Sequence, residues 1–181
     1  MDHDILVTNA RLRSGAIANI AISNGKIAQI GADVKGSAKL EIDAKRRLTT
    51  ETFVIAHLHL DKVFTMPIIG DATMLEYQAS GMGGTMSAIE IASRVKASYK
   101  ESEIIERVRK VLNEAKFHGV SHVRAFADVD TKAKLIGIQA LLKIREEYKG
   151  LIDIQVVAFP QDGIGREPGA DEYMWKAMEL G

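Results

Sequence analysis

The sequence contains no cysteine, no excess of either charge and no long apolar run, and each absence excludes a class of protein. Without cysteine there is neither a disulfide framework nor a thiolate-ligated metal site. Lys plus Arg and Asp plus Glu each number 24, so no basic field predicts binding to nucleic acid or to an anionic membrane. No stretch has the length of a membrane span, and the acidic N-terminus lacks the apolar core of a signal peptide. These features predict a soluble, cytoplasmic protein.

Apolar residues make up 46% of the 181 residues, which is enough for a hydrophobic core. Residues 1–50 contain short alternating or β-branched runs that are typical of strands, and Asn24-Gly25 is typical of a tight hairpin turn. We therefore predict a small antiparallel β module over residues 1–50, followed by a second domain over residues 51–181.

In residues 51–181, apolar strands alternate with amphipathic helices. This order predicts a parallel α/β sheet with right-handed crossovers. A closed barrel needs eight strand–helix units, so these residues correspond either to about three-eighths of a barrel or to a small open sheet. We expect strands at 53–59, 121–128 and 152–159, helices at 86–98, 103–118, 131–149 and 170–180, and a long loop over 62–84.

The most informative motif is the pair of histidines at the end of the first of these strands, in Phe53-Val54-Ile55-Ala56-His57-Leu58-His59-Leu60-Asp61. Side chains at positions i and i+2 of a strand point to the same face, so His57 and His59 can bind one cation together. Imidazole nitrogen suits zinc, iron and related divalent metals. The alternative is that both are ordinary strand histidines.

The order of these segments resembles the amidohydrolase superfamily and, within it, cytosine deaminase and its relatives. A β module is followed by the His57-Leu58-His59-Leu60-Asp61 motif, which is shared across that superfamily. The narrower match is Ala158-Phe159-Pro160-Gln161-Asp162-Gly163-Ile164, which resembles the cytosine deaminase branch. The resemblance implies an α/β fold in which a small β-sandwich module precedes the first three units of a TIM-like (β/α)₈ barrel, incomplete in this chain.

The resemblance also implies a site and a reaction. His57 and His59 match the first two ligands of one divalent metal ion, zinc or iron, and Gln161 matches a glutamine that binds the ring amide of a pyrimidine. A loop residue that satisfies backbone groups is the other interpretation of Gln161. Met86 matches a position that touches the substrate. The implied reaction is hydrolysis of a non-peptide C–N bond, most simply deamination of cytosine or of a similar amino-substituted nitrogen ring such as a triazine. The partner is thus a small heterocyclic molecule, and the complete protein is expected to be a homo-oligomer.

Two departures from the family pattern bear on these expectations. Lys62 stands where cytosine deaminases have threonine, and we interpret it as a solvated loop charge in preference to a partner of Asp61 or of an acidic substrate. The general acid/base and the remaining ligands are expected beyond Gly181, because His3, His118 and His122 do not replace them. A catalytic zinc site uses about three protein ligands, so the 181-residue chain alone is expected to be inactive.

Two other classes of function stay open at this stage. The chain could be a natural short, non-catalytic subunit that binds a partner or oligomerises through its sheet edges. It could also be a small open α/β domain that binds no metal.

Overall fold

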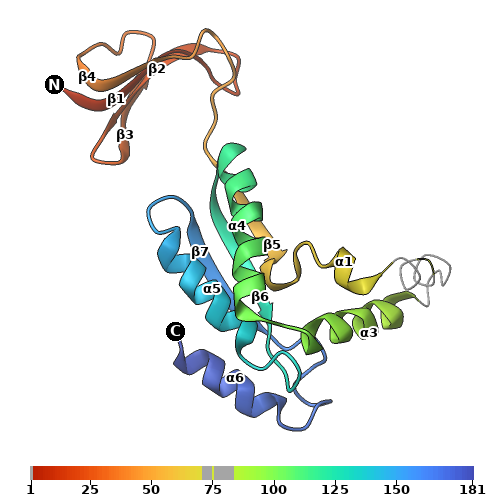
Figure 1. Ribbon diagram of the computed structural model, residues 1–181. Helices are drawn as coiled ribbons and strands as arrows, with labels where there is room; N and C mark the ends of the chain where they lie inside the picture. The colour runs from red at the N-terminus through yellow and green to blue at the C-terminus, as the bar shows by residue number, and fades with distance from the viewer. Residues whose placement is uncertain (1, 71–74, 76–83) are drawn as a thin grey trace. The chain divides into compact units, whose positions relative to one another are not determined.

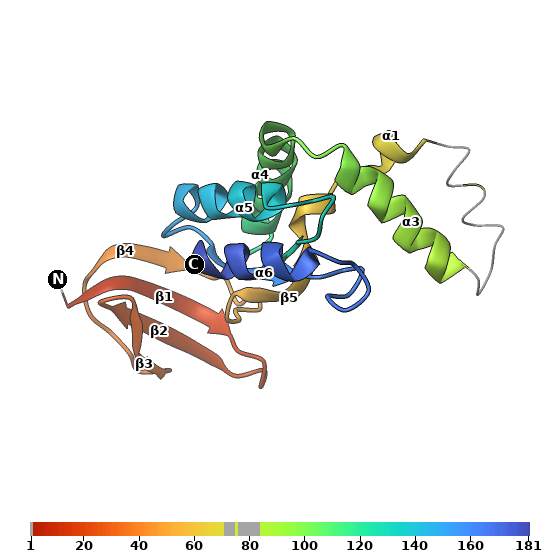
Figure 2. The same ribbon diagram turned by 90° about the horizontal axis from the view of Figure 1, so that it is seen from below.

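The computed structural model describes residues 2–70, 75 and 84–181, with the side chains of residues 84–89 left out. The chain divides into two compact units, Met1–Glu51 and Thr52–Gly181. Figures 1 and 2 show them from two directions, and each has its own sheet. Within the described ranges, no helix is both long and apolar enough to cross a membrane.

The first unit is one four-stranded sheet with strand order β3-β2-β1-β4. Its core is small and consists of Leu6, Ala21 and Val34, with Ala38 packed beside them. The Asn24-Gly25 turn is confirmed, because both residues have the positive φ values, 53° and 71°, that a tight hairpin requires. The strands are β1 (His3–Arg11), β2 (Ile17–Ser23), β3 (Lys26–Gly31) and β4 (Ala38–Asp43).

The prediction of an entirely antiparallel module is wrong for one pairing. β1 pairs with β2, and β2 with β3, in antiparallel fashion, but β4 pairs with β1 in parallel. The reason is that β3 and β4 occupy opposite edges of the sheet, so the connection between them crosses the sheet rather than forming another hairpin.

The second unit is a three-stranded parallel sheet, in the order β5-β6-β7, as the alternation of strands and helices predicts. Two helices, α4 and α5, pack side by side against this sheet (Figure 1). The large core between them includes Val108, Leu112, Val123 and Leu141. The elements are β5 (Phe53–His59), α4 (Glu101–Phe117), β6 (Val120–Asp128), α5 (Ile136–Glu147), β7 (Asp153–Phe159) and α6 (Ala170–Glu179).

The segment between β5 and α4 is more regular than the expected loop over 62–84. A 3₁₀ turn, η1 (Leu60–Lys62), follows β5 directly, and the short helix α1 (Met66–Ile69) begins with a proline in its first turn. Helix α3 (Gly84–Ala97) follows, close to the expected helix. The remainder of the expected loop, residues 71–74 and 76–83, lies outside the described residues.

Two expected helix starts are also corrected. Helix α4 begins at Glu101 rather than at 103, and its N-cap residue, Lys100, makes no side-chain capping bond. Helix α5 begins at Ile136 rather than at 131, because residues 131–135 form turns. The carboxylate of Asp130, which precedes those turns, accepts backbone hydrogen bonds from Lys132 and Ala133.

Candidate active site

The end of β5 presents the two histidines on one face of the sheet. The ring centroids of His57 and His59 are 5.2 Å apart, and the His57 ring stacks on Phe126 of β6 at 4.0 Å. The β5–β6 register shifts between Ile55 and Leu58. Because of this shift, the side chains of Ile55 and Leu58 both pack against the core, although they are three positions apart. The expectation that both histidines share a face is therefore met, with an irregular strand in place of strict alternation.

Two buried carboxylates lie beside His59. Asp128, at the end of β6, has Oδ1 at 3.5 Å from His59 Nδ1, and Asp61, in η1, has Oδ1 at 4.0 Å from the same atom. Both carboxylates are 0% exposed. The Asp61 Oδ2 atom accepts hydrogen bonds of 2.8 Å from the Tyr99 hydroxyl and from the backbone N–H of Asp128.

Their electrostatic environments differ. Burial, and then repulsion by Asp128, raises the pKa of Asp61 above its ordinary value. Burial acts in the same direction on Asp128, but the neighbouring His59 and the Lys62 ammonium outweigh it, so the pKa of Asp128 is lowered. Asp128 is therefore the more readily ionised of the two carboxyl groups, and it is the one that holds the nearby cation.

That cation is Lys62, and its interpretation as a solvated loop charge is wrong. Its ammonium group donates to both carboxylate oxygens of Asp128, at 2.8 and 2.9 Å, and to Oε1 of Gln161 at 3.2 Å. Only 16% of its side chain is exposed. The 3₁₀ turn after β5 directs Lys62 across to the end of β6, so it pairs with Asp128 rather than with Asp61.

A second lysine, Lys96 of α3, is completely buried at the same ends of the strands. Its ammonium group donates to Asp130 Oδ2 at 2.5 Å and to Asp162 Oδ2 at 2.9 Å, and it lies 3.7 Å from Asp128 Oδ2. Lys96 thus ties α3 to the loops that follow β6 and β7.

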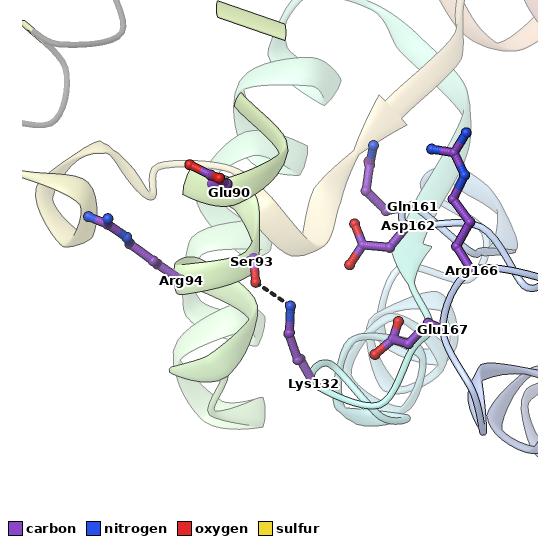
Figure 3. Close-up of a pocket in the computed structure, with 8 residues that line it drawn as sticks. All are labelled: Glu90, Ser93, Arg94, Lys132, Gln161, Asp162, Arg166 and Glu167. Carbon is purple, nitrogen blue, oxygen red and sulfur yellow. Dashed lines mark hydrogen bonds between the residues drawn. The ribbon is translucent and has the colours of Figure 1, made fainter. Parts of the chain in front are cut away.

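Gln161, in the loop after β7, lines a cavity of about 680 Å³. Figure 3 shows Gln161 and Asp162 side by side on this loop, opposite Ser93 of α3, which accepts a hydrogen bond from Lys132. The structure therefore places Gln161 at the carboxyl ends of the strands, linked through Lys62 to the same cluster as His59. The residues that line the cavity are Glu90, Ser93, Arg94, Lys132, Gln161, Asp162, Arg166 and Glu167.

The donor atoms around His59 fit a divalent cation. His59, Asp61 and Asp128 each offer one ligand atom within 4.8 Å of the others. His59 Nδ1 and Asp61 Oδ1 are buried and have no hydrogen-bond partner among the described residues. A mixed set of imidazole and carboxylate donors suits zinc or iron. His57 contributes its ring to the same face but is not in this close group.

The other residues singled out in the sequence lie away from this cluster. His3 is in the first unit beside Ser23, His118 caps the end of α4, and His122 is exposed near the start of β6. Met86 lies in α3, but its side chain is outside the described part.

The sequence analysis did not place Lys62 or Lys96 in the site. It also did not identify Asp128 as the buried carboxylate that lies beside both lysines. The available signal was position, since Asp128 ends a parallel strand, where ligand sites of α/β sheets gather. Nothing in the local sequence indicated which lysines fold back onto it.

Comparison with known proteins gives concordant results, although no protein-family model matches the chain. N-isopropylammelide isopropyl amidohydrolase from Pseudomonas sp. (strain ADP) is 34% identical over 181 residues, which are 99% of this chain and 44% of that protein. The crystal structure of 5-methylcytosine deaminase from Klebsiella pneumoniae superposes with a TM-score of 0.80 and 35% identity, over 97% of this chain and 41% of that one. N-isopropylammelide isopropylaminohydrolase from Burkholderia multivorans shares the fold, with a TM-score of 0.75 and 24% identity over 99% of this chain and 43% of that one.

These proteins are deaminases and hydrolases of the amidohydrolase superfamily, and the chain matches an N-terminal portion of such cytosine deaminase-like enzymes. The resemblance seen in the sequence is confirmed. The chain spans less than half the length of the relatives that it matches.

Proposed function

We propose that the chain is the front part of a metal-dependent hydrolase that cleaves a non-peptide C–N bond of an amino-substituted nitrogen ring. The observation that carries this proposal is the meeting of His59, Asp128 and Gln161 at one end of the parallel sheet. Lys62 joins Asp128, which lies beside His59, to the side-chain amide of Gln161. In the complete protein, the two units would form a β-sandwich module and the first three units of a (β/α)₈ barrel.

His57 and His59 would hold the ion, zinc or iron, with the carboxylates of Asp61 and Asp128 beside His59. When bound, such an ion activates water for attack on the carbon that carries the amino group. The stacking of His57 on Phe126 and the buried position of Asp61 hold this end of β5 in place.

Gln161 would bind the heterocyclic substrate through its side-chain amide, which can both donate and accept hydrogen bonds. The ring is cytosine-like or triazine-like, since the relatives include a 5-methylcytosine deaminase and an isopropylammelide hydrolase. Both kinds of ring carry an amino substituent on a carbon that is bonded to at least one ring nitrogen. Lys62 favours a ring that offers an acceptor near Gln161, because its ammonium occupies one side of the amide oxygen.

The test uses the full-length protein and measures both metal content and amine release. Purified without chelators, the wild type should retain about one zinc or iron per chain, consistent with a single site of this kind. It should release ammonia from cytosine or isopropylamine from N-isopropylammelide. His57→Ala with His59→Ala should lose the metal and the activity, whereas His118→Ala should lose neither.

The 181-residue polypeptide alone is proposed to give no turnover, because it spans less than half the length of the relatives that it matches. The proposed function would be contradicted if the double histidine variant retained the metal. It would also be contradicted if the wild type released an amine from neither ring. In the second case, a non-catalytic binding or oligomerising subunit becomes the better interpretation, and the oligomeric state should then be measured.

A further inference from the structure

Lys62 stands between an anchoring carboxylate and the amide of Gln161. Its Nζ donates to Asp128 Oδ1 at 2.8 Å, to Asp128 Oδ2 at 2.9 Å and to Gln161 Oε1 at 3.2 Å. An ammonium group has three protons and no acceptor, so these contacts account for its hydrogen-bonding capacity. The Lys62 side chain therefore has no spare donor for another group while this arrangement holds.

The same chemistry fixes which end of the Gln161 amide faces Lys62. An amide nitrogen placed there would set donor against donor, so the atom next to the ammonium has to be the oxygen. The NH₂ group of Gln161 is then turned away from Lys62. Gln161 lines the cavity of about 680 Å³. Since Lys62 already occupies one lone pair of the amide oxygen, we take the NH₂ group as the end that meets a ligand in this cavity.

Asp128 keeps Lys62 in this position. The carboxylate is 0% exposed, and the ammonium bridges both of its oxygens. Lys96 lies 3.7 Å from Asp128 Oδ2, so the carboxylate is flanked by two lysines. Lys62 is held at a charged, buried anchor, and a charge-assisted contact of this kind is stronger than a neutral hydrogen bond.

We propose that Lys62, anchored by Asp128, is a positioning residue that fixes the orientation of the Gln161 amide, so that its NH₂ group is offered to a carbonyl or ring-nitrogen acceptor of the ligand ring. This inference rests on the proposed function, which assigns Gln161 to ring binding. It adds that Lys62 acts through Gln161, and that the ring is recognised at this point by an acceptor rather than by a donor.

A double-mutant cycle on the full-length, zinc-loaded protein tests the proposal. The probe is phosphonocytosine, which is bound in a crystal structure of the 5-methylcytosine deaminase from Klebsiella pneumoniae, and its Kd is measured by calorimetry. Gln161→Ala and Lys62→Met should each weaken binding about 10-fold, the effect of losing about one hydrogen bond. The double variant should bind about as weakly as Gln161→Ala alone, since Lys62 then has no amide left to orient. As a matched control, Lys143→Met, which removes a lysine from a surface pair between α5 and α4, should leave Kd unchanged.

The variant Gln161→Glu provides a second test in which Lys62 is unchanged. The carboxylate can still accept from Lys62 but has no donor for the ring, so binding should fall at least as far as in Gln161→Ala. Losses that multiply to about 100-fold in the double variant, or wild-type affinity in Gln161→Glu, would overturn the positioning role while the proposed function stands. If the wild type binds no phosphonocytosine, this inference fails, whereas the proposed function stands or falls on metal content and on amine release from either ring.

Discussion

Lys96 is buried, and its charge is offset by carboxylates from two loops. Burial favours the neutral amine, but the hydrogen bonds to Asp130 and Asp162 outweigh it and raise the pKa of Lys96 above its ordinary value. The group is therefore a cation in the folded protein. Its removal would leave three carboxylates, including that of Asp128, clustered without it.

We predict that Lys96→Met lowers the free energy of unfolding by about 3–5 kcal/mol, the usual cost of breaking a buried ion pair from one side. The control is Lys143→Met, which removes an exposed partner of Glu101 and should cost no more than about 1 kcal/mol. Urea denaturation followed by circular dichroism measures both. Equal effects of the two substitutions would mean that the buried cluster contributes no more than a surface pair.

At the scale of single residues, the sequence predicted what depends on local spacing. His57 and His59 lie on one face because they are two positions apart on a strand, and Gln161 lies at a strand end because Pro160 ends β7. Lys62 was misjudged because lysine is usually exposed, and its partner Asp128 is 66 residues away in the sequence. Pairings over such distances depend on the tertiary fold, which local patterns do not contain.

At the scale of elements, the close approach of α5 to η1 and β6 depends on one glycine. A Cβ atom built on Gly137 would lie 3.3 Å from Ala127 Cβ and 3.4 Å from Asp61 Cβ. Both neighbours are atoms fixed to the backbone, so neither can move aside as the end of a flexible side chain would. The absence of a side chain at Gly137 therefore lets α5 pack directly over the turn that carries Asp61.

We predict that Gly137→Ala destabilises the protein by about 1–3 kcal/mol, because overpacking at this contact outweighs the roughly 1 kcal/mol by which alanine favours a helix. Gly165→Ala is the control, since nothing lies within 4 Å of the added Cβ, and its effect should stay within about 0.5 kcal/mol. Thermal denaturation compares the two. A more stable Gly137→Ala variant would show that α5 can shift outwards without cost.

The positions of helices and strands could be predicted where the apolar periodicity is strong. Their boundaries could not be predicted where capping residues determine them. The α4 pattern fixed a helix because Ile104, Val108 and Leu112 recur on one buried face. Helix α5 begins at Ile136 rather than at 131 because the carboxylate of Asp130, a residue type that often caps helices, here caps a series of turns and also pairs with Lys96. A residue that serves two structural purposes gives an ambiguous local signal.

At the scale of the whole molecule, the two units differ greatly in the size of their cores. The buried cluster of the first unit consists of Leu6, Ala21 and Val34, whereas that of the second extends across α4, α5 and all three strands. The sequence indicated a small β module but could not give its topology, because the parallel pairing of β4 with β1 joins segments with no shared local pattern. A small core buries too little apolar surface for high stability.

The distribution of aromatic residues makes this difference measurable, because every Phe, Tyr and Trp lies after residue 51. Near-ultraviolet circular dichroism therefore reports only on the second unit, through buried side chains such as Tyr99 and Tyr148, while far-ultraviolet circular dichroism reports on both. We predict that in urea the 181-residue polypeptide loses part of its far-ultraviolet signal before its near-ultraviolet signal changes. Leu6→Ala should move only the early phase to lower urea, and Leu112→Ala only the late phase, each by the equivalent of about 2–5 kcal/mol. A single transition that coincides for both signals, and that both substitutions shift alike, would show instead that the two units unfold as one cooperative structure.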